Sequence, residues 1–211
     1  MQNNKTLYDR CVAGSVEPAD SGSAGANAKN TFTDQSDTFS FKYPKTFNVV
    51  GGEIGFTQGW RQNAETLGNL FVSVIVPRSF MPKTNFSDAT FTVGASSNPD
   101  AIANCSKPTN GETHALAPGE HGDANTGKPV VVPINGTNFT KILLSDAAMS
   151  NYYDTVSYRT MKDGMCYAVE YTIHSTNAAV YDPAMGIQEF DRKKIETIMQ
   201  DMVNSFTFIK K

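Results

Sequence analysis

The stretch VSYRTMKDGMCYAVEYTIHST, residues 156–176, decides the fold. Apolar or aromatic side chains alternate with polar or small ones on both sides of a KDG turn at residues 162–164, which is the pattern of two strands joined in a hairpin. The Asp-Gly pair favours this turn because a tight hairpin needs residues that accept positive φ. Two strands joined in this way are antiparallel, so we expect a largely antiparallel sheet.

Similar patterns occur along much of the chain. In FSFKYP, Phe39, Phe41 and Tyr43 share one face of a run that stops at Pro44, and NLFVSVIVP has the β-branched composition of a strand buried on both faces. Further strands are expected at residues 39–44, 69–77, 130–134 and 137–144.

The clearest element predicted is a C-terminal amphipathic helix. One stripe of apolar side chains follows the helical period, and Asp191 precedes it as a cap. A short terminal strand, FTFIKK, follows, and Asn98 with Pro99 predicts a brief helix that ends near Cys105. Strands outnumber helices, so the fold class is α+β, with a helix packed on a sheet. The stripe consists of Ile195, Ile198, Met199, Met202, Val203 and Phe206.

Composition limits both the domain organisation and the range of partners. The chain has 211 residues, a net charge of -3 and a pI near 5.6, so it lacks the basic surface that nucleic acid requires. No apolar run approaches the roughly 20 residues of a transmembrane helix. Residues 1–37 are predicted to be a flexible tether, because residues 13–37 are rich in Gly, Ser, Ala and Asn. Residues 38–211 are predicted to be one domain.

Three reactive side chains lie on one strand. Cys166, Glu170 and His174 share a face by alternation. A strand rises about 3.3 Å per residue, so Glu170 and His174 are roughly 13 Å apart, too far for a catalytic triad. The interpretation that we favour is the polar face of a half-solvated sheet. Glu170, His174, Tyr153 and Tyr158 are its candidate polar-face or pocket residues, and no catalytic residue is assigned.

A second group of polar residues is considered as a metal site. The loop GETHALAPGEHGD carries five His and acidic residues, but their spacing matches no rigid motif, so a solvated loop is favoured. The segment YDPAMGIQEFD, with Asp182, Glu189 and Asp191, also lacks the spacing of a calcium loop. No cofactor is expected. The loop residues are Glu112, His114, Glu120, His121 and Asp123.

Four segments can be compared with a known group of domains: FSFKYPKTFNV (residues 39–49), VNSFTF (203–208), and YRTMKDGMCYAVEYTIHSTN (158–177) with YDPAMGIQEFD (181–191). Together they resemble the PsbP-like (Mog1/PsbP-like) group. The last two are similar to uncharacterised exported PsbP-related proteins of bacteria. The resemblance spans residues 38–211 and implies a three-layer α/β/α sandwich around an antiparallel sheet. It also implies an accessory or binding role without shared catalytic residues.

The resemblance further implies a compartment and a pairing of cysteines. Related proteins lie outside the cytoplasm, so we expect an extracytoplasmic protein whose signal has been removed, with membrane tethering through that segment; a cytoplasmic protein is the alternative. The three cysteines contain no CxxC pair, which argues against structural zinc. In an oxidising compartment Cys105 and Cys166 are the expected disulfide, because both lie inside the predicted domain.

Three hypotheses for the function follow. The first is a non-catalytic extracytoplasmic module that binds an unknown protein or small molecule. The second is a small hydrolase or metal-dependent enzyme whose site combines several strands with the loop at residues 106–129. The third is a structural surface or assembly protein, which predicts self-association.

Overall fold

The computed structural model describes residues 28–36, 38–51, 68–108 and 128–209. In chain order its elements are β1 (Lys29–Thr33), β2 (Phe39–Pro44), β3 (Asn48–Gly51), β4 (Asn69–Val76), β5 (Phe86–Ser96), α1 (Pro99–Ala103), β6 (Val130–Ile134), β7 (Thr137–Ala148), β8 (Asn151–Lys162), β9 (Met165–Thr176), α2 (Arg192–Ser205) and β10 (Thr207–Phe208). Short 3₁₀ turns lie at Arg78–Phe80, Ala178–Val180 and Pro183–Met185.

The main sheet is antiparallel and is centred on the predicted hairpin. Its seven strands run in the order β3-β4-β5-β9-β8-β7-β6, and β8 and β9 pair along their whole length, from Asn151 with Thr176 to Lys162 with Met165. At the turn between them, Asp163 and Gly164 have φ of 50° and 77°, as a two-residue hairpin turn requires. The α+β class with a largely antiparallel sheet is thereby confirmed.

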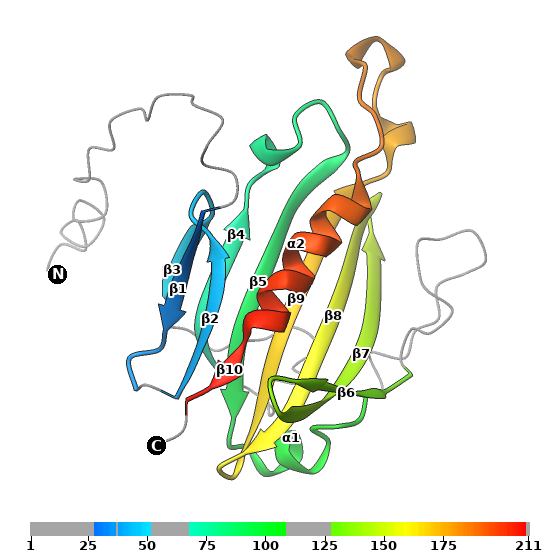
Figure 1. The fold of residues 1–211 in the computed structure, drawn as a ribbon. Helices are drawn as coiled ribbons and strands as arrows, with labels where there is room; N and C mark the ends of the chain where they lie inside the picture. Colours follow the sequence, from blue (N-terminus) through cyan, green and yellow to red (C-terminus); the bar gives the residue numbers. More distant parts are fainter. Residues whose placement is uncertain (1–27, 37, 52–67, 109–127, 210–211) are drawn as a thin grey trace, which may run out of the picture.

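A single layer covers one face of this sheet. Helix α2 lies over β9 and β5, beside a small sheet of order β1-β2-β10 (Figure 1). The rings of Phe41 and Phe91 lie 4.8 Å apart between centroids, and those of Phe39 and Phe71 lie 5.8 Å apart, so β2 packs on β4 and β5. The buried stripe of α2 joins the same core, and Ile195, Met199, Met202 and Val203 are all at most 1% exposed.

Local hydrogen bonds fix both ends of α2. The Asp191 carboxylate accepts a bond from the Lys194 amide at 3.0 Å, so the predicted cap is confirmed. Beyond the other end, the Asn135 side chain donates to the carbonyl oxygens of Asn204 and Phe206 at 2.9 and 2.7 Å. The β6–β7 turn thereby satisfies carbonyl groups that a helix leaves without intrahelical partners.

The opposite face of the main sheet carries the short helix α1. Asn98 caps it by accepting from the Asp100 amide at 2.8 Å, as its sequence predicts. Ala101 of α1 and Ala168 of β9 are buried together. In the described residues, helix on this face amounts to the five residues of α1, so the third layer of a sandwich stays an expectation from the resemblance.

The predicted tether is wrong at its C-terminal end. Residues 29–33 form strand β1, which pairs with β2 from Lys29 with Pro44 to Thr33 with Ser40. The sequence KNTFT contains a single large apolar residue, Phe32, whose ring stacks on that of Phe41 at 5.2 Å. One aromatic side chain and pairing with β2 suffice for an edge strand, and the pairing cannot be seen in the composition of residues 29–33. Residues 1–27 lie outside the described residues.

Asp34 stabilises the turn between β1 and β2. Its side chain is 9% exposed and accepts bonds from the amides of Phe39 at 3.0 Å, Thr38 and Ser36. Burial raises the pKa of Asp34, but these amide bonds together outweigh burial, and the net pKa is lowered. A lowered native pKa means that the carboxylate stabilises the fold above the ordinary Asp value of about 4, and that this contribution disappears as the pH falls through the native value.

Replacing Asp34 therefore has a pH-dependent effect. Asp34→Ala is expected to lower the free energy of unfolding by about 1–2 kcal/mol at pH 7, because three backbone amides, that of Phe39 buried, lose their acceptor. Asp34→Asn is the matched control, since it keeps an acceptor oxygen without the charge. Urea titrations from pH 7 to pH 2 should show the gap between this control variant and the wild type narrowing at acid pH. An unchanged gap would contradict the role of the charge.

Candidate functional site

Successive side chains of β9 point to opposite faces of the main sheet, so they lie in two different environments. Tyr167, Val169, Tyr171 and Ile173 face α2 and the small sheet and are buried in the core. Cys166, Glu170 and His174 face the other way, as the alternation predicts. We call this second side the polar face. It carries three groups of contacts in succession along β9: the disulfide, a buried ion pair and a histidine cluster.

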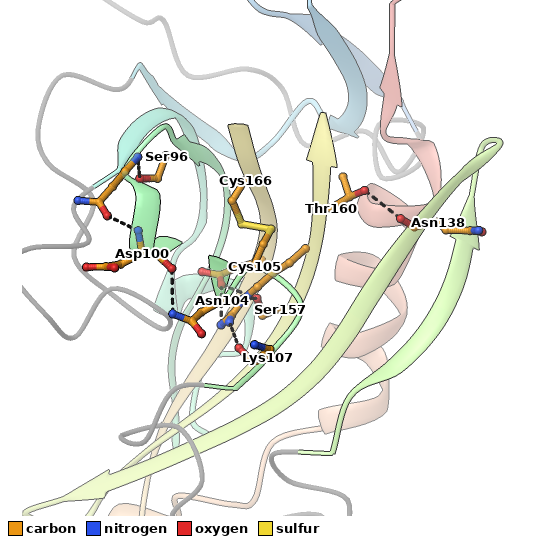
Figure 2. Close-up of a disulfide and its surroundings, with 12 residues drawn as sticks. Ser96, Asp100, Asn104, Cys105, Lys107, Asn138, Ser157, Thr160 and Cys166 are labelled. Atoms are coloured by element: carbon orange, nitrogen blue, oxygen red, sulfur yellow. Dashed lines mark hydrogen bonds and ion pairs between the residues drawn. A yellow bond between two sulfur atoms is a disulfide. The ribbon is translucent and has the colours of Figure 1, made fainter. Parts of the chain in front are cut away.

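The disulfide joins Cys105 to Cys166, as expected from the resemblance (Figure 2). Their Cα atoms lie 5.6 Å apart, and the two residues are 3% and 0% exposed. Cys105 follows α1, and its bond to β9 fixes the segment after the helix on the polar face. Asn104 supports this segment by donating from its side chain to the Asp100 carbonyl at 3.0 Å.

An ion pair is buried next to the disulfide. Arg159 of β8 is 0% exposed and Glu170 of β9 is 2% exposed. Ser157 connects them: its hydroxyl donates to Glu170 Oε1 at 2.6 Å and accepts from Arg159 Nε at 2.8 Å. Arg159 also donates to the Lys107 carbonyl at 3.2 Å, so the guanidinium and the disulfide hold the same segment. Glu170 is thus a structural partner of Arg159.

The histidine cluster lies at the far end of β9. His174 Nδ1 is 2.9 Å from Asp88 Oδ2 of β5, and Nε2 is 2.9 Å from Asn151 Oδ1 of β8. The Tyr153 ring stacks on the imidazole, with centroids 4.4 Å apart and planes tilted by 14°. The side chains of His174 and Asp88 are 20% and 43% exposed. Three strands therefore build one hydrogen-bonded polar platform that solvent reaches.

The chemistry available to this platform is recognition by hydrogen bonds and ring contact. A carboxylate on one imidazole nitrogen also orients a general base, but here Asn151 occupies the nitrogen that would face a substrate. Among the described residues, no three His, Cys, Asp or Glu side chains gather as a metal site. Thr155 of β8 and Thr172 of β9 extend the polar face, with hydroxyl oxygens 2.7 Å apart.

Tyr158 does not belong to this face, and its inclusion with Tyr153 was wrong. It points toward α2, is 2% exposed, and donates its hydroxyl to Gln200 at 2.7 Å. Burial raises the pKa of Tyr158 to about 12, although the bond to Gln200 lowers it in part. Positions 153 and 158 differ by an odd number, so a continuous strand places them on opposite faces.

The residues considered as metal ligands in the sequence are either outside the described residues or bonded to other parts of the fold. His114, Glu120, His121 and Asp123 lie outside the described residues, as does Glu112. Glu189 accepts a bond from the buried Asn85 amide at 2.7 Å, and Asp182 caps a 3₁₀ turn by accepting from Ala184 at 2.9 Å. Together with Asp191 at the start of α2, these residues have structural roles.

Sequence reasoning missed the partners of Glu170 and His174 on the polar face. Asp88, Asn151 and Arg159 reach it through strand pairing, with Asp88 opposite His174 and Arg159 opposite Ala168. Asn151 lies within SDAAMSNYYDT, for which no structure was predicted, and this segment consists of the ends of β7 and β8 with the turn between them. Extending the alternation of β8 backward from Arg159 would have placed Asn151 on the same face as Tyr153, which was already a candidate.

Comparisons with known proteins identify neither a family nor an activity. No protein-family model matches the chain, and no curated protein matches it significantly. One solved structure that aligns with it is a crystal structure from Bacteroides thetaiotaomicron, with 12% sequence identity and a TM-score of 0.38. The alignment covers 86% of this chain and 48% of that chain, so this chain spans about half the length of that protein. Separately, no helix in the described part of the chain has the length and apolar character to cross a membrane.

Proposed function

We propose that the protein is a non-catalytic binding or accessory module of an extracytoplasmic compartment, with a PsbP-like fold and a three-layer core. Its partner, a protein or a small molecule, binds the polar face at the platform formed by Asp88, Tyr153 and His174. The observation that carries this proposal is the stacked, hydrogen-bonded arrangement of this partly exposed platform.

Preorganisation is what makes this platform suited to binding. Side chains already fixed by neighbours lose little conformational entropy when a partner arrives. Tyr153 contributes a ring with a polar end, and such residues provide much of the binding energy in protein interfaces. Asp88, with 43% of its side chain exposed, adds acceptor oxygens at the margin of the platform.

The buried disulfide supports the proposed compartment. Disulfides persist in oxidising environments and are rare in the cytoplasm, where thiols are kept reduced. The bond between Cys105 and Cys166 lies at the other end of β9 from His174, where it anchors the segment after α1 on the polar face.

Cell fractionation with differential alkylation tests the compartment in the native organism. We expect the protein outside the cytoplasmic fraction, with Cys105 and Cys166 inert to alkylation in denaturant until reductant is added. Protein confined to the cytoplasm with both thiols reactive at once would overturn this half of the proposal.

A further inference from the structure

The turn between β7 and β8 is held in a conformation that its own residues disfavour. Met149 and Ser150 have φ of 49° and 65°, in the left-handed region that side chains with a Cβ rarely adopt. The other two-residue turns of the sheet use Asn135-Gly136 and Asp163-Gly164 at the same positions, which are the residues such turns prefer. Met149 is also 97% exposed, so core packing does not hold this turn.

Hydrogen bonds supply what the turn residues lack. The Asn151 side-chain amide donates to the carbonyl oxygens of Met149 at 3.1 Å and Ala148 at 3.4 Å, and the backbone amide of Asn177 donates to Ser150 O at 2.8 Å. Only the NH₂ group of the Asn151 amide can donate to these two carbonyl oxygens, so the two bonds fix which end of the amide faces the turn. Its oxygen consequently points to His174 Nε2, 2.9 Å away.

Both imidazole nitrogens of His174 therefore face acceptors. Nδ1 faces the Asp88 carboxylate and Nε2 faces the Asn151 oxygen, and both contacts are hydrogen bonds only when each nitrogen carries a proton. A neutral ring has one N–H and keeps one of the two. Since a charge-assisted bond to Asp88 is the stronger one, the contact to Asn151 is the one released.

We propose that His174 is a proton-sensitive latch on the β7–β8 turn. Protonated, it fixes Asn151, which holds Met149 and Ser150 in the strained turn; neutral, it frees Asn151 and the turn loosens. This inference stands apart from the proposed function, because it concerns the local stability of the turn whether or not a partner binds.

Other titratable groups around the ring lie on four strands and one loop. Asp88 faces His174 from β5 and Tyr153 stacks on it from β8. Asp146 of β7 pairs with Tyr153 one strand further away. On β9 itself, Glu170 is engaged with Ser157 and Arg159, and the loop after β9 contributes Glu189, which Asn85 holds. Asp88 is therefore the charge in direct contact with the ring.

NMR of the ¹⁵N-labelled protein between pH 5 and pH 8 tests the latch. Amide exchange at Met149 and Ser150 is measured relative to Asp163 and Gly164, the turn at the other end of β8, which removes the intrinsic pH dependence of exchange. We expect this ratio to rise about tenfold in step with the ring signals of His174, as for loss of one charge-assisted hydrogen bond. A ratio that stays constant from pH 5 to pH 8 would overturn the proposal.

Two variants separate the latch from a general effect of pH. Asn151→Ala should show a high ratio throughout that no longer follows His174, and a pH response that persists in this variant would also overturn the proposal. The variant Met149→Asn with Ser150→Gly introduces the Asn-Gly pair that such turns prefer. The exchange ratio should then stay low at every pH, and the urea midpoint should rise. A turn that still loosens in this second variant would refute the part played by strain.

Discussion

Replacing Cys105 and Cys166 together is expected to lower the free energy of unfolding by about 4 kcal/mol. The bridge joins positions separated by 61 residues, and closing a loop of this length removes that much chain entropy from the unfolded state in the standard model. Both residues are buried, so alanine and serine pairs should be compared to separate the cost of a buried hydroxyl. Urea denaturation measures the change.

Reductant provides the matched control for this prediction. Wild-type protein in excess dithiol should unfold near the midpoint of the double variants, whereas the double variants should not respond to dithiol at all. Each single variant should lose as much stability as the pair, because a bridge needs both sulfurs. Equal midpoints for oxidised and reduced wild type, measured after complete reduction in denaturant and refolding, would show that the bridge does not stabilise the fold.

Arg159→Met is expected to cost about 3–5 kcal/mol, because it leaves the Glu170 carboxylate buried without the guanidinium charge. Arg159 is 0% exposed, and its Nη2 lies 3.9 Å from Glu170 Oε1, with Ser157 bonded to both side chains. The Lys107 carbonyl also loses a donor in this variant, so the segment after the disulfide should exchange its amides faster.

The double variant Arg159→Met with Glu170→Leu shows how much of the stability lost in Arg159→Met is due to the unpaired buried charge of Glu170. Replacing both members of a buried ion pair by apolar side chains is often neutral or stabilising, so most of the lost stability should return. Urea midpoints of the wild type, both single variants and the double variant complete the cycle. Additive losses in the double variant would mean that packing, and not the buried charge, sets the effect of Arg159→Met.

The sequence was sufficient to predict turns and helix caps, because these depend on one or two neighbouring residues. Asp163-Gly164 specifies a turn and Asp191 a helix cap, and both have the predicted roles. Cys105 with Cys166 was reached through the resemblance, since spacing alone leaves the pairing of three cysteines open. Strand β1 was missed because KNTFT is weak on its own and gains its stability from β2 and Asp34.

The polar face was harder to predict because strand register builds it. Alternation correctly put Glu170 and His174 on one side of β9, but their partners Arg159 and Asp88 come from other strands. No local pattern shows that a buried arginine lies beside Glu170. Tyr158 was grouped with Tyr153 because no strand was predicted through Tyr153, and only the continuous strand β8 puts these two side chains on opposite faces.

The central claim is that a partner binds the polar face at Tyr153 and His174. Its most direct test is a photo-crosslinking amino acid placed at Tyr153 in the native organism, with the same group at Lys193, an exposed position on α2, as the control. We predict one discrete adduct from position 153 that is absent from position 193 and is lost when His174→Ala is added. No adduct at position 153, or equal adducts at both positions, would contradict the claim.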